Sequence, residues 1–418
     1  MKSQEKRLYI FILLIMAGVT VAAFINQGFE PTMRNLMVIQ KHPGRLINDF
    51  TQVGGVGAAL LNAVLISLIA LLIIYLNKVT LSGPTLAAIF TIFGFGLFGK
   101  TPINILPIFL GVYISAKIVG KSYQEYLLIA LFGTALGPLV TFMIFEFGFV
   151  GIPGLILGII SGVIAGILLP PLARSMLHMH QGYNLYNIGL TCGFLGLFAA
   201  GVVEATGRKL VIEVIWNKTP STLMILLVPV ISVMFVIAGL MERKQKVFTD
   251  FLLIQRKSGR LPSDFIDMVT LGGSLLNIGL LGIGSWLYVL AVGGDFNGPV
   301  LGGIFTIMGF GAFGKHLKNS WPVMLGVLLG CFIFGMNPAD PGPILAALFV
   351  TTLAPLAGQF GPIIGIIGGV THLLMVMRSA AWHGGFDLYN NGFAGGLTAT
   401  LMVAVIEWYK SIKEEGLE

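Results

Sequence analysis

The stretch Phe90-Thr-Ile-Phe-Gly-Phe-Gly-Leu-Phe-Gly-Lys100 decides the fold, because it returns almost unchanged as Phe305-Thr-Ile-Met-Gly-Phe-Gly-Ala-Phe-Gly-Lys315. The same shift of 215 residues aligns further polar positions on both sides of the motif. They are Gln40 with Gln255, Arg45 with Arg260, Asp49 with Asp264, Asn62 with Asn277 and Asn104 with Asn319. Chance similarity among apolar residues does not reproduce polar positions in this order, so the chain is an internal duplication.

The chain around this motif is strongly apolar. Hydrophobic residues fill 56% of its 418 positions, charged residues fill 10%, and the mean hydropathy is +0.91. A water-exposed surface cannot be built from this composition, and a helix of about 20 residues spans the hydrocarbon layer of a bilayer. The sequence therefore predicts an all-α integral membrane protein. We attribute its net charge of +7 to membrane orientation and anionic headgroups, and we expect no nucleic acid partner.

Each half contains seven apolar segments, which gives about 14 membrane segments. Those of the first half lie near 8–27, 54–77, 83–98, 103–119, 124–149, 151–173 and 184–204. Those of the second half lie near 220–240, 269–292, 298–313, 321–338, 341–359, 361–377 and 387–408. The third and fourth segments of each half are short and flanked by Gly and Pro, so they either span the membrane or form a re-entrant hairpin.

Both alternatives give each half an odd number of crossings, so the second half enters the membrane from the opposite side. The sequence thus predicts two inverted homologous repeats, 1–211 and 212–418, an architecture common among secondary transporters. Most of the 25 lysine and arginine residues then fall on the side of the N-terminus, largely through the loop 241–262. The positive-inside rule therefore places both termini in the cytoplasm. We interpret the first segment as a retained helix and not as a signal peptide.

The repeated motif suggests two kinds of site. Ser82-Gly83-Pro84 and Asn297-Gly298-Pro299 predict helix starts, either inside the membrane, where free N–H groups would face a solute, or at its surface. The glycines that follow favour close helix packing or an unwound backbone that lines a cavity. Lys100 and Lys315 are expected at opposite mouths, each beside a water-accessible vestibule that attracts anions. The alternative is that both lysines lie at the interface and reach lipid headgroups.

A second motif reads His180-x-Gly-Tyr-Asn-Leu-Tyr-Asn-x-Gly189 and His383-x-Gly-Phe-Asp-Leu-Tyr-Asn-x-Gly392. Polar side chains inside membrane helices mark cavities more often than not, so we expect the solute site here. The predicted binding residues are Asn184, Tyr186, Asn187, Asp387, Tyr389, Asn390 and Asn391, together with Ser82, Asn297, His180 and His383. The alternative is that these groups only join helices by hydrogen bonds while the histidines close a loop.

The two copies of this motif differ where Asn184 corresponds to Asp387. An unpaired carboxylate in a membrane can bind H⁺ or Na⁺ and so couple transport, or it can stay protonated as a hydrogen-bond donor. Glu146, whose approximate partner is Gln359, is a second candidate for ion coupling. No metal site and no other cofactor is expected, since Cys192 and Cys331 show no metal-ligand spacing.

The Gly-Phe-Gly-x-Phe-Gly-Lys and Leu-Tyr-Asn-x-Gly motifs resemble those of an uncharacterised family of bacterial membrane proteins that carry a duplicated domain of unknown function. That resemblance covers nearly the whole chain and implies a bacterial inner-membrane location without an assigned activity. Gly182-Tyr183-Asn184 and Gly385-Phe386-Asp387 are similar to part of the Gly-[Tyr/Phe]-Asn-Gly turn of urea transporters. The final glycine of that turn is missing here, as is the Leu-Pro-x-x-Thr element of that family.

Together these features predict a membrane transporter or channel for a small polar or anionic solute, with its site between the two repeats. A membrane enzyme acting on a lipid-linked substrate is an alternative, but no nucleophile elbow or His-Glu-x-x-His motif is present, so we expect no enzymatic activity. A third hypothesis is a membrane scaffold subunit that recruits partners through the basic loop 241–262. The expected partners are a small-molecule solute and the bilayer, and the sequence is compatible with a homo-oligomer.

Overall fold

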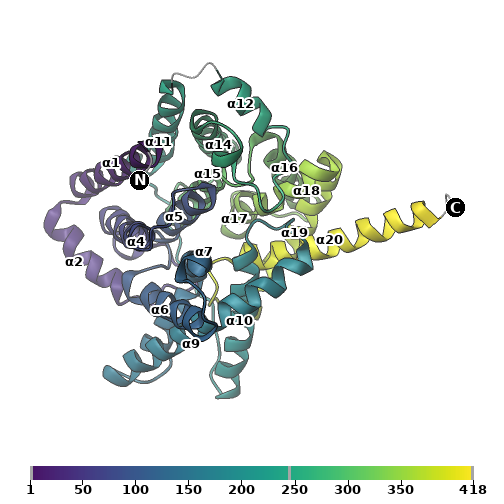
Figure 1. The fold of residues 1–418 in the computed structure, drawn as a ribbon. Helices are drawn as coiled ribbons and strands as arrows, with labels where there is room; N and C mark the ends of the chain where they lie inside the picture. Colours follow the sequence, from purple (N-terminus) through teal and green to yellow (C-terminus); the bar gives the residue numbers. More distant parts are fainter. Residues whose placement is uncertain (1–2, 243–245, 416–418) are drawn as a thin grey trace.

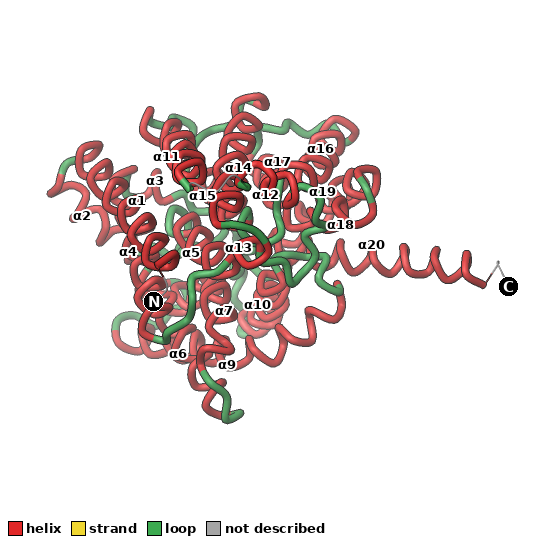
Figure 2. The backbone as a smooth tube through the Cα atoms, turned by 45° about the horizontal axis from the view of Figure 1, so that its top comes forward, coloured by secondary structure: helices red, strands yellow, loops and turns green. Residues whose placement is uncertain are grey.

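The computed structural model describes residues 3–242 and 246–415, and all regular elements in these ranges are helices (Figures 1 and 2). Residues 243–245 of the predicted basic loop lie outside the described residues. The helices of the first half are α1 (Ser3–Gln27), α2 (Phe29–Gln40), α3 (Phe50–Val53), α4 (Val56–Leu76), α5 (Gly83–Phe95), α6 (Pro102–Ile118), α7 (Tyr123–Gly133), α8 (Gly137–Phe145), α9 (Ile152–His180) and α10 (Asn187–Ala205).

The second half repeats this order of long and short helices. Its members are α11 (Thr222–Met241), α12 (Val247–Ile254), α13 (Phe265–Met268), α14 (Leu271–Val292), α15 (Gly298–Phe310), α16 (Leu317–Ile333), α17 (Pro341–Phe349), α18 (Ala354–Phe360), α19 (Pro362–Trp382) and α20 (Asn390–Glu415). Short 3-10 turns, Thr134–Leu136 and Val350–Leu353, join α7 to α8 and α17 to α18. The C-terminal part of α20 projects away from the body (Figure 2).

Ten helical stretches of the described chain are long and apolar enough to cross a membrane, which makes this a multi-pass membrane protein by helix length and hydropathy. They correspond to α1, α4, α7–α8, α9 and α10 and to their counterparts in the second half. The remaining predicted segments form the shorter apolar helices α5, α6, α15 and α16. A 13-residue helix such as α5 rises only about 20 Å, less than the roughly 30 Å hydrocarbon layer.

The long helices divide into an inner and an outer group. In the most apolar 18-residue window of each stretch, 89% of α7–α8 and 83% of α17–α18 is buried within the protein. The corresponding shares for α9 and α19 are 33% and 39%. The outer helices present large apolar side chains to their surroundings, as Ile156, Ile160 and Ile164 do on α9. Such a surface suits contact with lipid chains, and it surrounds a core in which nearly every residue of α5 and α15 is buried.

At the centre, α5 and α15 lie side by side (Figure 1), and their residue contacts show that they run antiparallel. A Cβ atom on Gly94 would lie 2.7 Å from the carbonyl oxygen of Gly302, and one on Gly309 would lie 3.0 Å from Cα of Ala87. The two contacts are equivalent, because the 215-residue shift maps Gly94 onto Gly309 and Ala87 onto Gly302. The close-packing interpretation of these glycines is therefore confirmed.

Reciprocal contacts of this kind are the signature of a two-fold axis. They recur between α10 and α20, where a Cβ atom on Gly189 would lie 3.0 Å from Cα of Gly392, and one on Gly392 would lie 2.9 Å from Cα of Gly189. Since the equivalent central helices α5 and α15 run in opposite directions, the axis is perpendicular to them. The duplicated sequence thus builds two halves that meet face to face along this axis.

The segment 206–221 between α10 and α11 breaks this symmetry, because α10 ends at Ala205 whereas its counterpart α20 continues as a helix to Glu415. It runs beside the loop before α3, where the Asp49 N–H donates to the Ile215 carbonyl at 3.0 Å and the Ile215 N–H donates to the Ile47 carbonyl at 3.0 Å. The indole N–H of Trp216 donates to Asp295 Oδ2 at 2.9 Å, which ties the segment to the second half as well. We call residues 206–221 the linker.

Candidate functional site

Each repeated lysine ends a glycine turn that amide side chains hold in place. Asn62 donates from Nδ2 to the carbonyl oxygens of Gly96 and Lys100, at 2.7 and 2.8 Å, and Gln40 donates to Asn62 Oδ1 at 3.0 Å. The second half repeats all three bonds with every residue shifted by 215. The matched amides of the sequence alignment therefore build the support of the lysine.

A second amide closes the turn from the other side. Asn104 accepts from the Thr101 N–H at 2.9 Å and donates to the Gly99 carbonyl at 2.8 Å. Gly99 has φ +131°, a conformation that L side chains rarely adopt, and its counterpart Gly314 has φ +96°. Glycine is required at these two positions, and the turn has the same geometry in both halves.

The N-termini of α5 and α15 bind carboxylates of the opposite half. The Gly83 N–H donates to both carboxylate oxygens of Asp264 at 3.0 Å, and the Gly298 N–H donates to Asp49 Oδ1 at 3.2 Å. A helix N-terminus favours a negative charge, so each half supplies an anion to the central helix of its partner. Ser82 forms a capping box with Thr85.

Asn297, the counterpart of Ser82, also has partners within the protein. Its Oδ1 accepts from the Val300 N–H at 3.2 Å, and its Nδ2 donates to the Asn217 carbonyl at 3.1 Å. The side chain is fully buried. The first residues of α15 are thus capped by Asp49 and Asn297, and those of α5 by Asp264 and Ser82.

Lys100 and Lys315 lie at opposite ends of the antiparallel pair α5 and α15, five residues beyond the last residue of each helix. Both side chains are 0% exposed. The expectation that they lie at water-accessible mouths is therefore wrong, as is the alternative that they reach lipid headgroups. The sequence could not reveal this, because the turn that carries each lysine is covered by helices of both halves.

A row of aromatic rings in tilted and edge-to-face contact connects the two lysines. Its members, in order, are Phe95, Tyr389, Tyr186 and Phe310, and neighbouring ring centroids are 4.6, 5.1 and 4.8 Å apart. Lys100 Nζ lies 4.9 Å from the centroid of the first ring, and Lys315 Nζ lies 5.0 Å from that of the last. The two-fold axis passes between the tyrosines, which come from the two copies of the second motif. We call the lysines, the tyrosines and their polar neighbours the central cluster.

The half of the central cluster around Lys315 has all its hydrogen bonds. Lys315 Nζ donates to the Tyr186 hydroxyl and, at 2.7 Å, to Thr351 Oγ1. Asn184 accepts from the Thr352 hydroxyl and donates from Nδ2 to the Gly392 carbonyl at 3.2 Å. These polar groups are buried and paired, as is usual for groups that stabilise a protein core.

The half around Lys100 is unfinished. Among the described residues, Lys100 Nζ and Asp387 Oδ2 have no hydrogen-bond partner, although both side chains are fully buried. The Tyr389 hydroxyl faces the Thr91 side chain. Lys100 and Asp387 interact electrostatically without forming an ion pair within 4.0 Å in that part of the chain. Native proteins rarely leave buried polar atoms without partners, so these two atoms mark the candidate site.

The histidines and asparagines of the second motif pair with each other. His180 Nε2 lies 2.9 Å from Asn187 Oδ1, and Asn187 donates to the Ala173 carbonyl at 3.0 Å. His383 and Asn390 repeat this pair at 3.0 Å. Asn391 differs, since its Oδ1 lies 3.1 Å from Nε2 of His372 on α19. The structure gives these amides partners within the protein, which is the hydrogen-bonding arrangement considered as the alternative to solute binding.

A cavity of about 370 Å³ leads from the second-half loop to the central cluster. Both halves line it, and its walls are largely apolar. Its lining includes Leu261 and Pro262 of that loop, Phe313 after α15, and the rings of Tyr186 and Tyr389. Asn187 also contributes to the wall, whereas neither lysine does. The cavity therefore reaches the tyrosine pair but neither lysine.

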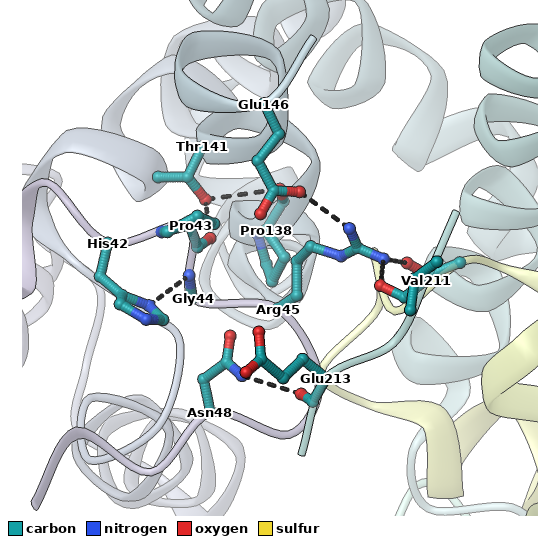
Figure 3. Close-up of polar contacts among 11 residues, drawn as sticks. His42, Pro43, Gly44, Arg45, Asn48, Pro138, Thr141, Glu146, Val211 and Glu213 are labelled. Carbon is teal, nitrogen blue, oxygen red and sulfur yellow. Dashed lines mark hydrogen bonds and ion pairs between the residues drawn. The ribbon is translucent and has the colours of Figure 1, made fainter. Parts of the chain in front are cut away.

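The equivalent loop of the first half is closed by the linker (Figure 3). Arg45, the counterpart of the exposed Arg260, is 7% exposed and forms an ion pair with Glu146 at 2.8 Å. Its guanidinium also donates to the carbonyl oxygens of Val211 in the linker and, at 3.2 Å, of Gly384. The structure thus places the coupling candidate Glu146 beside an arginine at this closure, so Glu146 is not an unpaired carboxylate.

Sequence reasoning missed several residues of this arrangement. Asp49 and Asp264 stood out only as an aligned pair, and their role depends on helices that lie far away in the chain. Thr351 and Thr352 carried no signal, because a threonine in an apolar segment is common. The matched polar positions were the available clue, since a duplicated chain keeps polar residues where both halves need the same hydrogen bonds.

The chain belongs to the family described as "Protein of unknown function (DUF1576)", whose model matches residues 29–205 and 243–408. The match in two segments agrees with the duplication and with the resemblance found in the sequence. No curated protein and no solved structure matches the chain.

Proposed function

We propose that the protein is a transporter that carries a small anionic or polar solute between its two halves, past Tyr186 and Tyr389. The observation that carries this proposal is the presence of two fully buried lysines, one on each side of the tyrosine pair. Within the described residues neither lysine has a carboxylate within 4.0 Å. A buried charge without a counterion is costly, and an anion that passes through would supply the missing charge.

The proposed topology is that of inverted repeats in a bacterial inner membrane, with both termini in the cytoplasm. The antiparallel orientation of α5 and α15 supports it, because a two-fold axis perpendicular to helices that cross a bilayer lies in the membrane plane. The odd number of apolar segments in each half and the surplus of basic residues near the N-terminal side support the same orientation.

The two loops at the ends of the central cluster suggest alternating access. In this structure the second-half loop borders the 370 Å³ cavity, whereas the linker covers the first-half loop. A transporter needs one closed and one open end at any time, and the duplicated architecture lets the halves exchange these roles. We therefore assign this conformation to a state that is open on the side of Leu261 and Pro262.

The test is uptake into proteoliposomes. Vesicles containing the wild-type protein would be offered sulfate, lactate, glycine and urea in separate experiments, with protein-free vesicles as the background. We expect saturable uptake of at least one anion. Lys100→Gln should reduce it about tenfold or more, because a charged hydrogen bond contributes about 1.5–3 kcal/mol. Uptake no greater than in protein-free vesicles for all four solutes, with folded protein confirmed by chromatography, would overturn the proposal.

A further inference from the structure

We infer that Asp387, Lys100 and Tyr389 form a proton-coupling site, and that a proton and an anion bind there together. This inference rests on the proposed transport function and adds its driving force. It assigns the coupling to one half of the central cluster only, the half around Lys100.

The first argument is the pair of unpartnered atoms. Lys100 Nζ offers donors without an acceptor, while Asp387 Oδ2 has no donor in the described part of the chain. Asp387 Oδ1 is occupied, since it accepts from the Tyr389 N–H at 2.8 Å. The free oxygen can therefore take a proton without breaking a bond that holds the motif together.

The second argument is the comparison with the other half, where the same backbone carries paired groups. Thr352 donates its hydroxyl to Asn184, whereas Ala135, the residue equivalent to Thr352, has no hydroxyl to offer Asp387. The equivalence is clear from the backbone, because the Leu185 N–H donates to the Thr352 carbonyl at 3.0 Å and the Leu388 N–H donates to the Ala135 carbonyl at 3.1 Å. Two changes, a hydroxyl lost and an amide turned into a carboxyl, leave one half titratable.

The third argument identifies the ion. A hard metal cation needs several oxygen ligands, but the charged neighbour of Asp387 is the Lys100 ammonium, which repels cations. A proton needs neither a ligand set nor a cavity, and it suits a carboxyl group that is 0% exposed. H⁺ is thus favoured over Na⁺, and Asp387 is favoured over the arginine-paired Glu146.

The groups that face Asp387 determine how its protonation changes anion binding. Lys100, Cys192 and Tyr389 interact with it electrostatically, and His383 Nδ1 accepts its backbone N–H at 3.3 Å. Lys100 is the cation among them, since the His383 ring accepts at Nδ1 and faces Asn390 Oδ1 with Nε2, as a neutral imidazole does. When Asp387 is ionised it competes with an external anion for Lys100. When it is protonated, Lys100 is left without a counter-charge and attracts the anion.

The proton balance is simple. Asp387 gains a proton from water on one side of the membrane, which forms its O–H bond, and an anion then binds to Lys100. When the site faces the other side, the anion leaves, the O–H bond breaks, and the proton returns to water. Because each ligand favours the binding of the other, the coupling is symport, and linkage makes the effect reciprocal.

The test measures anion affinity against pH with sulfate and methanesulfonate, whose charge does not change in the range used. Wild-type affinity should fall as the pH rises, by up to about tenfold per pH unit for one linked proton. Asp387→Asn mimics the protonated carboxyl, so its affinity should stay high until the pH at which Lys100 itself loses its proton. In proteoliposomes this variant should still exchange anions but no longer respond to a proton gradient. An equal pH dependence in wild type and Asp387→Asn would overturn the inference.

Two controls keep the test decisive. The double variant Ala135→Thr, Asp387→Asn copies the paired half and should behave like Asp387→Asn even if the single variant is unstable. Infrared spectroscopy needs no solute, and it should show a protonated carboxyl band in wild type that is absent from both variants. That band in wild type without any anion flux would leave the proton site standing and overturn the transport function. Anion flux without the band, and without pH dependence, would overturn the proton site alone.

Discussion

The two halves of the central cluster share a backbone and differ in chemistry. Around Lys315 the polar groups have partners, whereas around Lys100 two buried atoms, Lys100 Nζ and Asp387 Oδ2, have none among the described residues. The turn that carries the lysine is the same in both halves, down to the bonds that Asn62 and Asn277 make. The difference teaches that duplication preserved the groups that position the backbone, while substitutions at two neighbouring positions changed what the site can bind.

The two ends of the molecule differ in the same way. The linker covers the first-half loop around Arg45, and the second-half loop around Arg260 is open to the cavity. A connection between repeats exists only once, so it necessarily makes the halves unequal. Each of the following predictions compares a residue with its counterpart, beginning with the largest expected effect.

The largest difference is expected between Asp49→Ala and Asp264→Ala. Asp49 is fully buried and accepts from Thr51, Asn217 and Gly298, so its loss leaves several buried donors unpaired. We expect it to cost about 4 kcal/mol, and Asp264→Ala about 1–2 kcal/mol because Asp264 is partly exposed. Thermal unfolding of the purified variants measures both. Equal losses would show that the cross-caps do not depend on burial.

The next comparison is between Arg45→Met and Arg260→Met. Arg45 holds Glu146 and the Val211 carbonyl, and losing the bonds of this buried guanidinium, whose carboxylate partner is 34% exposed, should cost about 2 kcal/mol. Arg260 is exposed and donates to the Gln181 carbonyl, so its replacement should cost less than about 1 kcal/mol. Limited proteolysis should cut the linker faster only in Arg45→Met. Unchanged cleavage there would mean that the ion pair does not hold the linker.

Lys315→Met should lower stability, whereas Lys100→Met should abolish transport without lowering stability. Lys315→Met removes the partner of Tyr186 and Thr351, and we expect a loss of about 2 kcal/mol. Lys100→Met removes an unpaired buried cation, so the unfolding temperature should stay the same or rise while anion uptake is lost. A destabilised Lys100→Met would indicate a partner that the cluster does not show, and chromatography would control for aggregation.

The smallest effect is expected for Asn184→Asp. This change removes the amide donor to the Gly392 carbonyl and places a carboxyl oxygen against it, at a cost of about 1 kcal/mol when the new carboxyl is protonated. The stability of Asn184→Asp should therefore fall as the pH rises, because ionisation would bury a second charge. Asp387→Asn, the reverse change, should be neutral or stabilising. Thermal unfolding across pH checks both, and a pH-independent Asn184→Asp would contradict the comparison.

Much of the fold follows from local sequence. The predicted segment 83–98 appears as Gly83–Phe95, and the segment 54–77 appears as Val56–Leu76. Apolar length predicts these elements, and Gly and Pro mark their ends. The prediction failed at the end of α9, expected at 173 and found at His180, since polar residues at a membrane surface end the apolar pattern without ending the helix.

The candidate site was predicted in part. The second motif does reach the central cluster, because the rings of Tyr186 and Tyr389 contact each other at the axis. Its solute-binding role remains a prediction, and most of its amides bond within the protein. The position of the lysines was wrong because a lysine after a short apolar helix ordinarily lies at an interface. Burial here results from packing between residues far apart in the chain, such as Lys315 and Tyr186, which are 129 positions apart.

The sequence by itself determined that the chain is a duplicated, all-helical membrane protein, because periodicity, apolar length and matched polar positions are properties of the chain alone. Only the tertiary structure decided that each half caps the central helix of the other, that both lysines are buried, and that one half of the central cluster is unpaired. These features depend on which residues meet across the two-fold axis. A hydrogen-bond partner is defined by position in space. That Ala135 leaves Asp387 without a hydroxyl donor becomes apparent only when the two halves are brought together.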